Sequence, residues 1–408
     1  MALKLRIQLL TVTLLRVILN TMHRMVYPFL SVFARGLGVD VTAISLALVG
    51  RNFVGIFGPF LAPLANQRGR RFGMLAGITA FTLGVGLVAV HPGLFTLSAA
   101  LILAILSKSL FDPTMQAYFG DRIPYEQRGT ALAITEMSWS AAFILGVPAM
   151  GYLIGRFGWS APFPVLAALG LVMFAVVWRM IPRKDAEDGM AVTDQMLTGA
   201  AHPNLQAVLA SIPALAGISI VLWAGAANEM VNLVFGVWLE NSFGLQIAAL
   251  AGASVVIGLS ELSGEGLVAL TTDRLGKPRA VAFGLTGNIL ASILLPFIGR
   301  SEIGALIGLF LFYITFEYMV VSQLPMMTES VPQARATVMA FNLVGFGIGR
   351  SFGALLSTFI YLKMGFLSVT LVATLFNTFA LLALAEVQEK IIILPHFIAW
   401  FKRTFQAD

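Results

Sequence analysis

The sequence predicts an all-α membrane protein with twelve transmembrane helices arranged as two six-helix bundles. Three observations support this prediction: the composition, the length of the apolar runs and a repeat of two loop motifs. Hydrophobic residues make up 58% of the 408 positions and charged residues only 11%, whereas a soluble protein carries roughly a quarter charged residues. Such a chain cannot cover itself with a polar surface, so we expect lipid to surround most of it.

The apolar runs have the length of membrane-spanning helices. A backbone inside a bilayer must satisfy its own hydrogen bonds, which leaves helices and closed barrels. The runs last about 18–25 residues, which suits helices, because barrel strands are nearer ten residues and alternate in polarity. We expect spans at 9–32, 43–65, 72–90, 95–119, 130–153, 159–181, 208–236, 247–270, 280–298, 303–326, 336–360 and 367–387.

One long polar segment divides the runs into two sets of six. It begins at Pro182 and reads Pro-Arg-Lys-Asp-Ala-Glu-Asp. The predicted organisation is an N-terminal bundle at 1–181, a cytoplasmic linker at 182–207, a C-terminal bundle at 208–390 and an amphipathic cytoplasmic tail at 391–408.

The positive charges predict the orientation. The loops on one side hold Arg35, Arg156, Arg300 and Lys363, whereas the other loops and both termini hold seventeen lysine and arginine residues. Positive residues concentrate on the cytoplasmic side, so we expect a multi-pass protein of the cell (inner) membrane with both termini in the cytoplasm. The first run is too long for the apolar region of a signal peptide, so we expect it to be retained.

Several classes of function are disfavoured. The net charge of +6 lies in short loops and forms no basic face with interleaved aromatic residues, so we expect no nucleic-acid partner. Cysteine is absent, which excludes thiolate metal sites. The metalloprotease motif His-Glu-x-x-His and the phosphate-binding motif Gly-x-x-x-x-Gly-Lys-Ser/Thr do not occur. Residues 349–353 match Gly-x-Ser-x-Gly but lie inside an apolar run. We therefore expect no enzyme, cofactor or metal.

Two loop motifs recur at one offset. Residues 66–71 read Asn-Gln-Arg-Gly-Arg-Arg, and residues 273–277, which begin 207 positions later, read Asp-Arg-Leu-Gly-Lys. Residues 121–124 read Asp-Arg-Ile-Pro, and residues 329–332, which begin 208 positions later, read Glu-Ser-Val-Pro. Two unrelated signals at nearly the same offset indicate a duplicated six-helix unit, an arrangement typical of secondary transporters.

These motifs resemble the major facilitator superfamily over essentially the whole chain. The family's loop between helices two and three reads Gly-x-x-x-Asp-Arg-x-Gly-Arg-Arg/Lys, and residues 62–71 follow it, with Asn66 in the place of the acid. The resemblance implies alternating access, with a cytoplasmic network that holds the outward-facing state closed from inside. The conformational motif would consist of Asn66, Gly69, Arg70, Arg71, Asp273, Arg274, Gly276 and Lys277.

Residues 146–151, Gly-Val-Pro-Ala-Met-Gly, are similar to the Gly/Pro kink in helix five of the twelve-helix drug/proton antiporters. Those exporters often carry an arginine in helix four. That place falls near Leu101 here, and Lys108 and Asp112 further along are candidates for a related role. The Gly/Pro segment, rather than the place of this arginine, favours the efflux branch.

Ionisable residues in the spans indicate a polar cavity. Each costs about 2.5–3.5 kcal/mol at the centre of a bilayer unless it is paired or hydrated. Arg16 is close enough to the membrane surface to extend its head group to the cytoplasm. The residues are Arg16, His23, Arg24, Arg51, Lys108, Asp112, Glu136, Glu229, Glu261, Glu265, Glu317 and Arg350.

Polar stripes on helices one and seven predict the substrate path. One face of helix one carries Arg16, Asn20, His23 and Tyr27. Aligning the two helices by the repeat places Glu229 opposite His23, so His23 or Arg24 could face Glu229; a packing role for His23 is the alternative. The predicted substrate-binding residues are His23, Arg24, Tyr27, Arg51, Asn52, Asn228, Asn232 and Arg350.

The acids predict proton coupling. Glu261 and Glu265 lie one helical turn apart and cannot both ionise cheaply. Glu317 and Arg350 lie at matching depths, either as a static ion pair or with a role in substrate or proton binding. Glu136 either carries protons or caps the loop cations Arg122 and Arg128. The predicted proton-coupling residues are Asp112, Glu136, Glu229, Glu261, Glu265 and Glu317.

The favoured hypothesis is a monomeric, proton-coupled exporter of a small amphipathic solute, with protons and the lipid bilayer as its other partners. The alternative is uptake or facilitated transport of an organic anion or a lipid-like molecule, because the spans also hold a cationic set.

Overall fold

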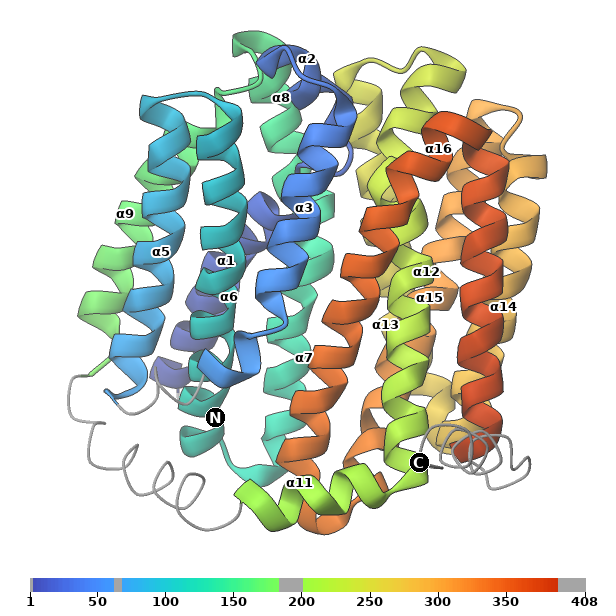
Figure 1. Cartoon of the computed structure of the whole chain (residues 1–408). Helices are drawn as coiled ribbons and strands as arrows, with labels where there is room; N and C mark the ends of the chain where they lie inside the picture. Colours follow the sequence, from blue (N-terminus) through green and yellow to red (C-terminus); the bar gives the residue numbers. More distant parts are fainter. Residues whose placement is uncertain (1–2, 62–67, 183–200, 388–408) are drawn as a thin grey trace, which may run out of the picture.

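The computed structural model describes residues 3–61, 68–182 and 201–387. Helices run side by side along the long dimension of the molecule, in an N-terminal set and a C-terminal set (Figure 1). The described chain begins and ends at the same end of this bundle, and we call this end the termini side. Asn66, most of the expected linker and the expected amphipathic tail lie outside the described residues.

The N-terminal half follows the predicted runs closely. Its long helices alternate in direction (Figure 1). In chain order its elements are α1 (Leu3–Arg24), α2 (Leu30–Leu37), α3 (Val41–Gly55), α5 (Arg70–Val90), α6 (Leu94–Arg122), α7 (Tyr125–Ala141), the π-helix η1 (Ala142–Gly146), α8 (Val147–Phe157) and α9 (Pro162–Met180).

The C-terminal half begins with a short helix, α11, that lies across the termini side and overlaps the expected linker (Figure 1). In chain order its elements are α11 (Ala201–Ala210), α12 (Ile212–Phe243), α13 (Ile247–Leu275), α14 (Lys277–Ile298), α15 (Glu302–Ser330), the 3-10 turn η2 (Pro332–Ala334) and α16 (Arg335–Val387).

Within the described ranges, ten helices are long and apolar enough to cross a membrane. The last of them contains α16, whose 53 residues would reach about 80 Å at 1.5 Å per residue. It reverses direction at Gly365, where φ is 78° and ψ is −179°, so it supplies two spans (Figure 1). With these two arms and the shorter α3, the helices correspond to the twelve predicted runs.

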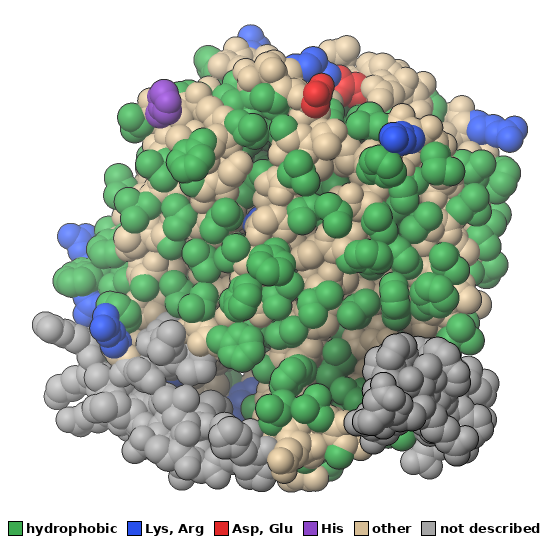
Figure 2. Space-filling model, in the orientation of Figure 1, with side chains coloured by type: hydrophobic (Ala, Val, Ile, Leu, Met, Phe, Trp, Pro, Cys, Tyr) green, Lys and Arg blue, Asp and Glu red, His purple; other side chains and the backbone are tan. Residues whose placement is uncertain are grey.

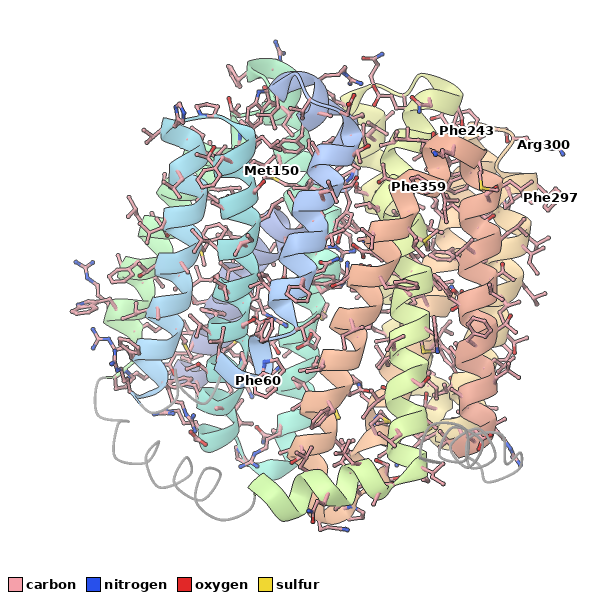
Figure 3. The ribbon with its side chains drawn as sticks, in the orientation of Figure 1. Phe60, Met150, Phe243, Phe297, Arg300 and Phe359 are labelled. Atoms are coloured by element: carbon pink, nitrogen blue, oxygen red, sulfur yellow. The ribbon has the colours of Figure 1, made fainter. Side chains whose placement is uncertain are left out.

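The outer surface is suited to lipid. Figure 2 shows a face whose central band is covered mostly by hydrophobic side chains. Phe60, Phe297 and Phe359 are each more than half exposed, and Figure 3 marks their places on the bundle. An apolar surface of this extent is stable only when hydrocarbon replaces water around it.

The first span is broken where the sequence predicted one continuous helix. Residues 25–29 form turns between α1 and α2. Pro28 lies in this break and has no N–H to donate to a helix. The N–H of Tyr27 donates to the carbonyl of Arg24 (3.3 Å) rather than to that of His23, one turn earlier. The break leaves the His23 carbonyl without its helical partner, and it places Tyr27 between the two halves.

The duplication extends to the backbone. Among the residues that the structure describes, six glycines have positive φ, and they form three pairs 206 or 207 residues apart. Because a Cβ at five of these positions (Gly38, Gly158, Gly244, Gly276 and Gly365) would meet nothing within 4 Å, backbone conformation rather than space calls for glycine there. The pairs are Gly38 with Gly244 (φ 67° and 66°), Gly69 with Gly276 (93° and 84°) and Gly158 with Gly365 (92° and 78°).

Both copies of the loop motif make the same contact. In the N-terminal half, Arg70 at the start of α5 pairs with Asp121 at the end of α6 (Nε to Oδ2, 3.2 Å). In the C-terminal half, Lys277 at the start of α14 pairs with Glu329 at the end of α15. The N-terminal half therefore has a charged contact at this loop through Asp121. The side chain of Asp273 lies outside the described residues, and Arg274 is exposed.

The two halves pack closely at two glycines. A Cβ at Gly236 would lie 2.5 Å from the carbonyl oxygen of Pro28, and one at Gly258 would lie 2.9 Å from that of Ser140. Small residues let helices in a membrane approach to backbone contact. Helix α12 therefore packs against the break after α1, and α13 packs against α7 of the N-terminal half.

Replacing Gly276 by alanine should lower stability, because a side chain is strained at φ 84° and ψ 140°. The expected loss is about 1–3 kcal/mol. Gly252→Ala is the matched control: Gly252 is exposed inside α13 and has open space for a Cβ, so the change should stabilise by about 0.5–1 kcal/mol. Thermal unfolding in one detergent compares the two variants. Equal midpoints would contradict this explanation of the turn.

Candidate functional site

A group of polar side chains meets where the first span breaks, and we call it the Tyr27 cluster. Both halves contribute to it, from the break after α1, from α3, from α12 and from α16. Its members are Tyr27, Arg51, Asn52, Glu229, Asn232 and Arg350.

The hydroxyl of Tyr27 links the charged members. It donates to Oε1 of Glu229 (2.9 Å). It accepts from Nη2 of Arg51 (2.5 Å) and from Nη2 of Arg350 (2.8 Å). A hydroxyl has one hydrogen to donate and two lone pairs, so all its hydrogen-bonding capacity is used.

The carboxylate of Glu229 is fully buried and receives donors from both halves. From the N-terminal half, Tyr27 and the amide of Asn52 (3.1 Å) donate to Oε1. From its own half, Asn232 (3.3 Å) and Nε of Arg350 (2.8 Å) donate to Oε2. Such a complete set of partners is what keeps a carboxylate ionised in an apolar interior.

Arg51 is held in place by the broken helix. Its side chain is wholly buried, and Nη1 donates to the carbonyl of His23 (2.9 Å). The break after α1 leaves that carbonyl without a helical partner, and carbonyls at helix ends need one. Nη2 also donates to Oδ1 of Asn52 (3.0 Å). The cluster thus contains two arginines and one carboxylate.

A second contact between the halves joins Arg24 to Glu261. The guanidinium donates through both terminal nitrogens, at 2.7 and 2.6 Å, and both side chains are about 95% buried. It also lies over the rings of Phe143 and Trp139, with its central carbon 3.4 and 4.3 Å from the ring centroids. A paired fork of this kind, stacked on aromatic rings, is a favourable environment for a buried arginine.

Two further carboxylates lie beside this pair on the C-terminal half. Glu265 accepts a hydrogen bond from the hydroxyl of Ser140 (3.4 Å). Glu317 lies against Gly264, where a Cβ would be 3.0 Å from the Cβ of Glu317. The charges of Glu261, Glu265 and Glu317 act on one another. Three carboxylates of the C-terminal half therefore gather near Arg24.

A third polar group lies within the N-terminal half, nearer the termini side. Arg16 pairs with Asp112 and with Glu136, both at 3.0 Å. Lys108 pairs with Asp112 (3.0 Å) and donates to the side chain of Asn20. Two cations and two acids balance one another in this group.

A cavity of about 240 Å³ opens between α6 and α7 beside this third group. Its wall contacts the group directly, because the carbonyl of Thr135 accepts from Arg16 (2.7 Å). The lining residues are Met115, Gln116, Phe119, Gly120, Ile123, Arg128, Ala131, Leu132 and Thr135.

At the end opposite the termini side, polar contacts again join the halves. Glu240 of α12 pairs with Arg35 of α2 (2.6 Å) and accepts from Ser31. The hydroxyls of Ser45 on α3 and Thr358 on α16 lie 2.7 Å apart. The Tyr27 cluster and the Arg24–Glu261 pair join the halves at mid-depth, and the contacts of Glu240 and Ser45 join them near the end opposite the termini side.

Two pairings that the sequence suggested are wrong, that of Arg24 with Glu229, offered as an alternative to His23, and that of Glu317 with Arg350. Arg24 binds Glu261, so it does not face Glu229, which binds Arg350. Glu317 is therefore not the partner of Arg350. The expected pairings matched residues by depth along each helix, which does not determine the direction in which a side chain points.

Arg16 and Glu136 also differ from the expectation. Arg16 is 95% buried and does not extend to the membrane surface. Glu136 pairs with Arg16 rather than capping a loop cation. Arg16 does not extend to water at the membrane surface because the two acids Asp112 and Glu136 pair with it inside the bundle.

Other expected substrate residues lie near the Tyr27 cluster. The ring of His23 lies 5.7 Å from that of Trp139, and its Nδ1 is buried with no hydrogen-bond partner. Asn228 is buried beside Glu229 on α12, and its amide nitrogen also has no partner. Among the described residues, no group of three or more His, Asp or Glu side chains is placed to hold a metal ion.

The predicted sets of substrate-binding and proton-coupling residues left out three residues that complete these groups. Tyr313 of α15 donates to Oδ1 of Asn232 (2.8 Å), and Arg16 and Lys108 belong to the third group. The cost of a buried charge had marked both cations in the sequence. Tyr313 carries no such signal, because an aromatic residue in an apolar helix is ordinary.

The family model of the Major Facilitator Superfamily matches residues 12–354, which include most of both halves. The chain belongs to the Major Facilitator Superfamily.

Among curated proteins, this superfamily member is similar to bacterial transporters. It is 24% identical to the uncharacterized MFS-type transporter YbcL of Bacillus subtilis, over 82% of this chain and 86% of the relative. It is 26% identical to the uncharacterized MFS-type transporter YwfA of the same organism, over 85% and 83%. It is 26% identical to the inner membrane transport protein YdhP of Escherichia coli, over 80% and 81%. The chain is therefore a secondary transporter of this superfamily.

Solved structures share the fold at low sequence identity. The human organic anion transporter MFSD10 (TETRAN) matches with a TM-score of 0.67 and 16% identity, over 95% of this chain and all of the other. A bacterial homologue of the lysosomal transporter Spinster, in an inward-facing and unoccupied conformation, matches with a TM-score of 0.71 and 14% identity, over 96% and 99%.

Breaking the Arg24–Glu261 pair should be costly, because the remaining charge is buried without its partner. Arg24→Gln and Glu261→Gln should each lower the free energy of unfolding by about 3–5 kcal/mol. The double variant should lose about 0.5–3 kcal/mol less than the sum of the single losses. Chemical unfolding in one detergent measures this cycle.

The matched control is the Arg35–Glu240 pair, in which the arginine side chain is 62% exposed. Its removal should cost only about 0.2–1 kcal/mol. Strictly additive losses for Arg24 and Glu261 would show that the buried pair is not coupled.

Proposed function

We propose that this transporter exports a small amphipathic solute in exchange for protons, by alternating access between its two halves. The observation that supports proton coupling is the gathering of Glu261, Glu265 and Glu317 near Arg24, with which only Glu261 among the three forms an ion pair in the described part of the chain. Ionised carboxylates without cations are costly at bilayer depth, and a proton is the simplest partner that removes this cost.

The Arg24–Glu261 pair would couple the proton to movement. The two side chains belong to different halves. Their contact, in which two guanidinium nitrogens bind two carboxylate oxygens, depends on an ionised carboxylate. A proton on Glu261 removes that charge and weakens the contact between the halves. Protonation of the C-terminal acids would therefore favour the state in which the halves separate at this depth.

The contacts between the halves support a state that is open toward the termini side. They lie in the Tyr27 cluster, at the Arg24–Glu261 pair and at Glu240 near the opposite end. We infer that the termini side is cytoplasmic, because the basic residues Arg70, Arg122 and Lys277 lie at the ends of helices there. Since the chain has no cysteine, labelling Gln333→Cys from each side of the membrane checks this orientation.

Export is supported by the local structure of the fifth span. The π-helix η1 (Ala142–Gly146) ends two residues before Pro148, in the Gly/Pro segment that is similar to the kink of exporters. Insertions of this kind bend a helix. The bend carries Phe143, which stacks on Arg24, so the shape of this span bears directly on the proposed coupling contact.

If protons control the contact between halves, lowering the pH should change the conformation without a solute. Spin labels at Gln127→Cys and Gln333→Cys, one exposed position in each half near the termini side, report the separation by pulsed electron resonance in nanodiscs. We expect acid to shift the population toward shorter distances, because the halves then close on the termini side. Glu265→Gln with Glu317→Gln should remove most of this response.

Glu302→Gln is the matched control, because this carboxylate is exposed at the start of the same helix, α15, and should leave the response unchanged. A distance distribution independent of pH would overturn proton coupling.

The direction of transport is measured from the flux of two matched probes, 2-naphthalenesulfonate and 2-naphthyltrimethylammonium, into proteoliposomes. An exchanger accumulates its solute inside proteoliposomes with an acid interior, whereas accumulation with an alkaline interior would indicate uptake with protons.

A further inference from the structure

We propose that the solute carries a single carboxylate, or an anion of the same shape, which binds Tyr27, Arg51 and Asn52 in the place that Glu229 now occupies. This inference rests on the alternating-access function proposed above and adds the chemical class of its solute. Its basis is a carboxylate-binding site, built mostly from one half of the protein and filled by a side chain of the other.

The donors around Glu229 divide between the halves. Tyr27 and Asn52 donate to Oε1 from the N-terminal half, and Arg51 supports both, through its bonds to the tyrosine hydroxyl and to the asparagine carbonyl. On the C-terminal side, Arg350 and Asn232 donate to Oε2. The N-terminal half therefore presents a preformed anion site to a carboxylate that belongs to the other half.

Separation of the halves leaves the two sides with different charges. Glu229 and Arg350 both belong to the C-terminal half and neutralise one another, with Nη2 of the arginine 2.6 Å from Oε2 of the acid. Arg51 stays in the N-terminal half with Tyr27 and Asn52, none of which carries a negative charge. At this cluster the N-terminal half thus retains one unbalanced positive charge, that of Arg51, and an anion is the ligand that it lacks.

Arg51 cannot easily turn away to find another partner. Its side chain is wholly buried, and the carbonyl of His23 holds Nη1 at 2.9 Å. A buried charge without a partner is strongly destabilising. An anion that completes the site therefore stabilises the separated state, and this makes conformational change depend on the solute.

A cationic solute fits this place less well. It would need Glu229, which Arg350 and Asn232 already occupy within the same helix bundle. The aromatic ring of Phe346, whose centroid lies 5.7 Å from the guanidinium carbon of Arg350, provides an apolar wall on one side of the cluster. The arrangement therefore favours an anion with an apolar body.

The inference is tested by binding at constant pH to the full-length protein in nanodiscs. The probes are benzoate, 2-naphthoate and decanoate, which differ in the size of the apolar body, with 2-naphthyltrimethylammonium as the matched cation. Glu229→Gln keeps the shape of the side chain but removes its charge. We expect this variant to bind at least one of the carboxylates about tenfold more tightly than the unaltered protein, and the cation no more tightly.

The site residues are then tested in the Glu229→Gln background. Arg51→Lys keeps the charge but loses the planar fork, and Tyr27→Phe removes only the hydroxyl; each should weaken carboxylate binding by about fivefold or more. Arg300→Gln is the control, because Arg300 is exposed at the periphery of the bundle (Figure 3) and should bind as before. Thermal unfolding of each variant verifies that it is folded.

The inference is overturned if Glu229→Gln binds none of the carboxylates more tightly, or if it gains affinity for the cation. It is also overturned if folded Arg51→Lys and Tyr27→Phe both bind as well as their parent. These outcomes do not depend on proton coupling, because the pH is constant. Conversely, pH-independent spin-label distances would remove the proton coupling and leave the carboxylate measurement unaffected.

Discussion

The cost of a charge at bilayer depth shapes the interior of this transporter. The intramembrane cations Arg16, Arg24, Arg51 and Lys108 belong to the N-terminal half, where they outnumber the two acids of that half. The C-terminal half shows the opposite excess, with four glutamates and Arg350. Since neither half balances its own charges, contacts across the interface, such as Arg24–Glu261 and Tyr27–Glu229, give buried charges partners that their own half does not supply. Any change that alters a charge at the interface therefore alters the contact between the halves.

A local break in one helix creates the most connected of these contacts. Pro28 and the turns at residues 25–29 interrupt the first span, and the interruption leaves a backbone carbonyl that Arg51 then binds. The same interruption places the Tyr27 hydroxyl among two arginines and a glutamate. Broken helices are found at the binding sites of transporters because irregular backbone inside a membrane is tolerated only where it is buried in protein or lines a cavity. Backbone and side chains thus act as one unit in this cluster.

Much of the fold could be predicted from the sequence, because hydropathy fixes spans and the repeated loops fix their duplication. The contacts Arg70–Asp121 and Lys277–Glu329 arise from the two motifs that indicated the repeat. The site was predicted less well. Depth along a helix can be counted from residue numbers, but azimuth and tilt depend on packing, and so Arg350 was matched with Glu317 rather than with Glu229. The break at residues 25–29 was missed because the apolar pattern continues through it.

The three pairs of turn glycines show which part of the duplication both halves retain. Gly38 and Gly244, Gly69 and Gly276, and Gly158 and Gly365 adopt matching backbone angles, whereas Arg51 has Gly258 at the position 207 residues later. The turns of the two copies are alike, and their buried charges have diverged. Evolution can therefore change the side chains of one copy while its sister preserves the common frame, and a new cargo requires no new architecture.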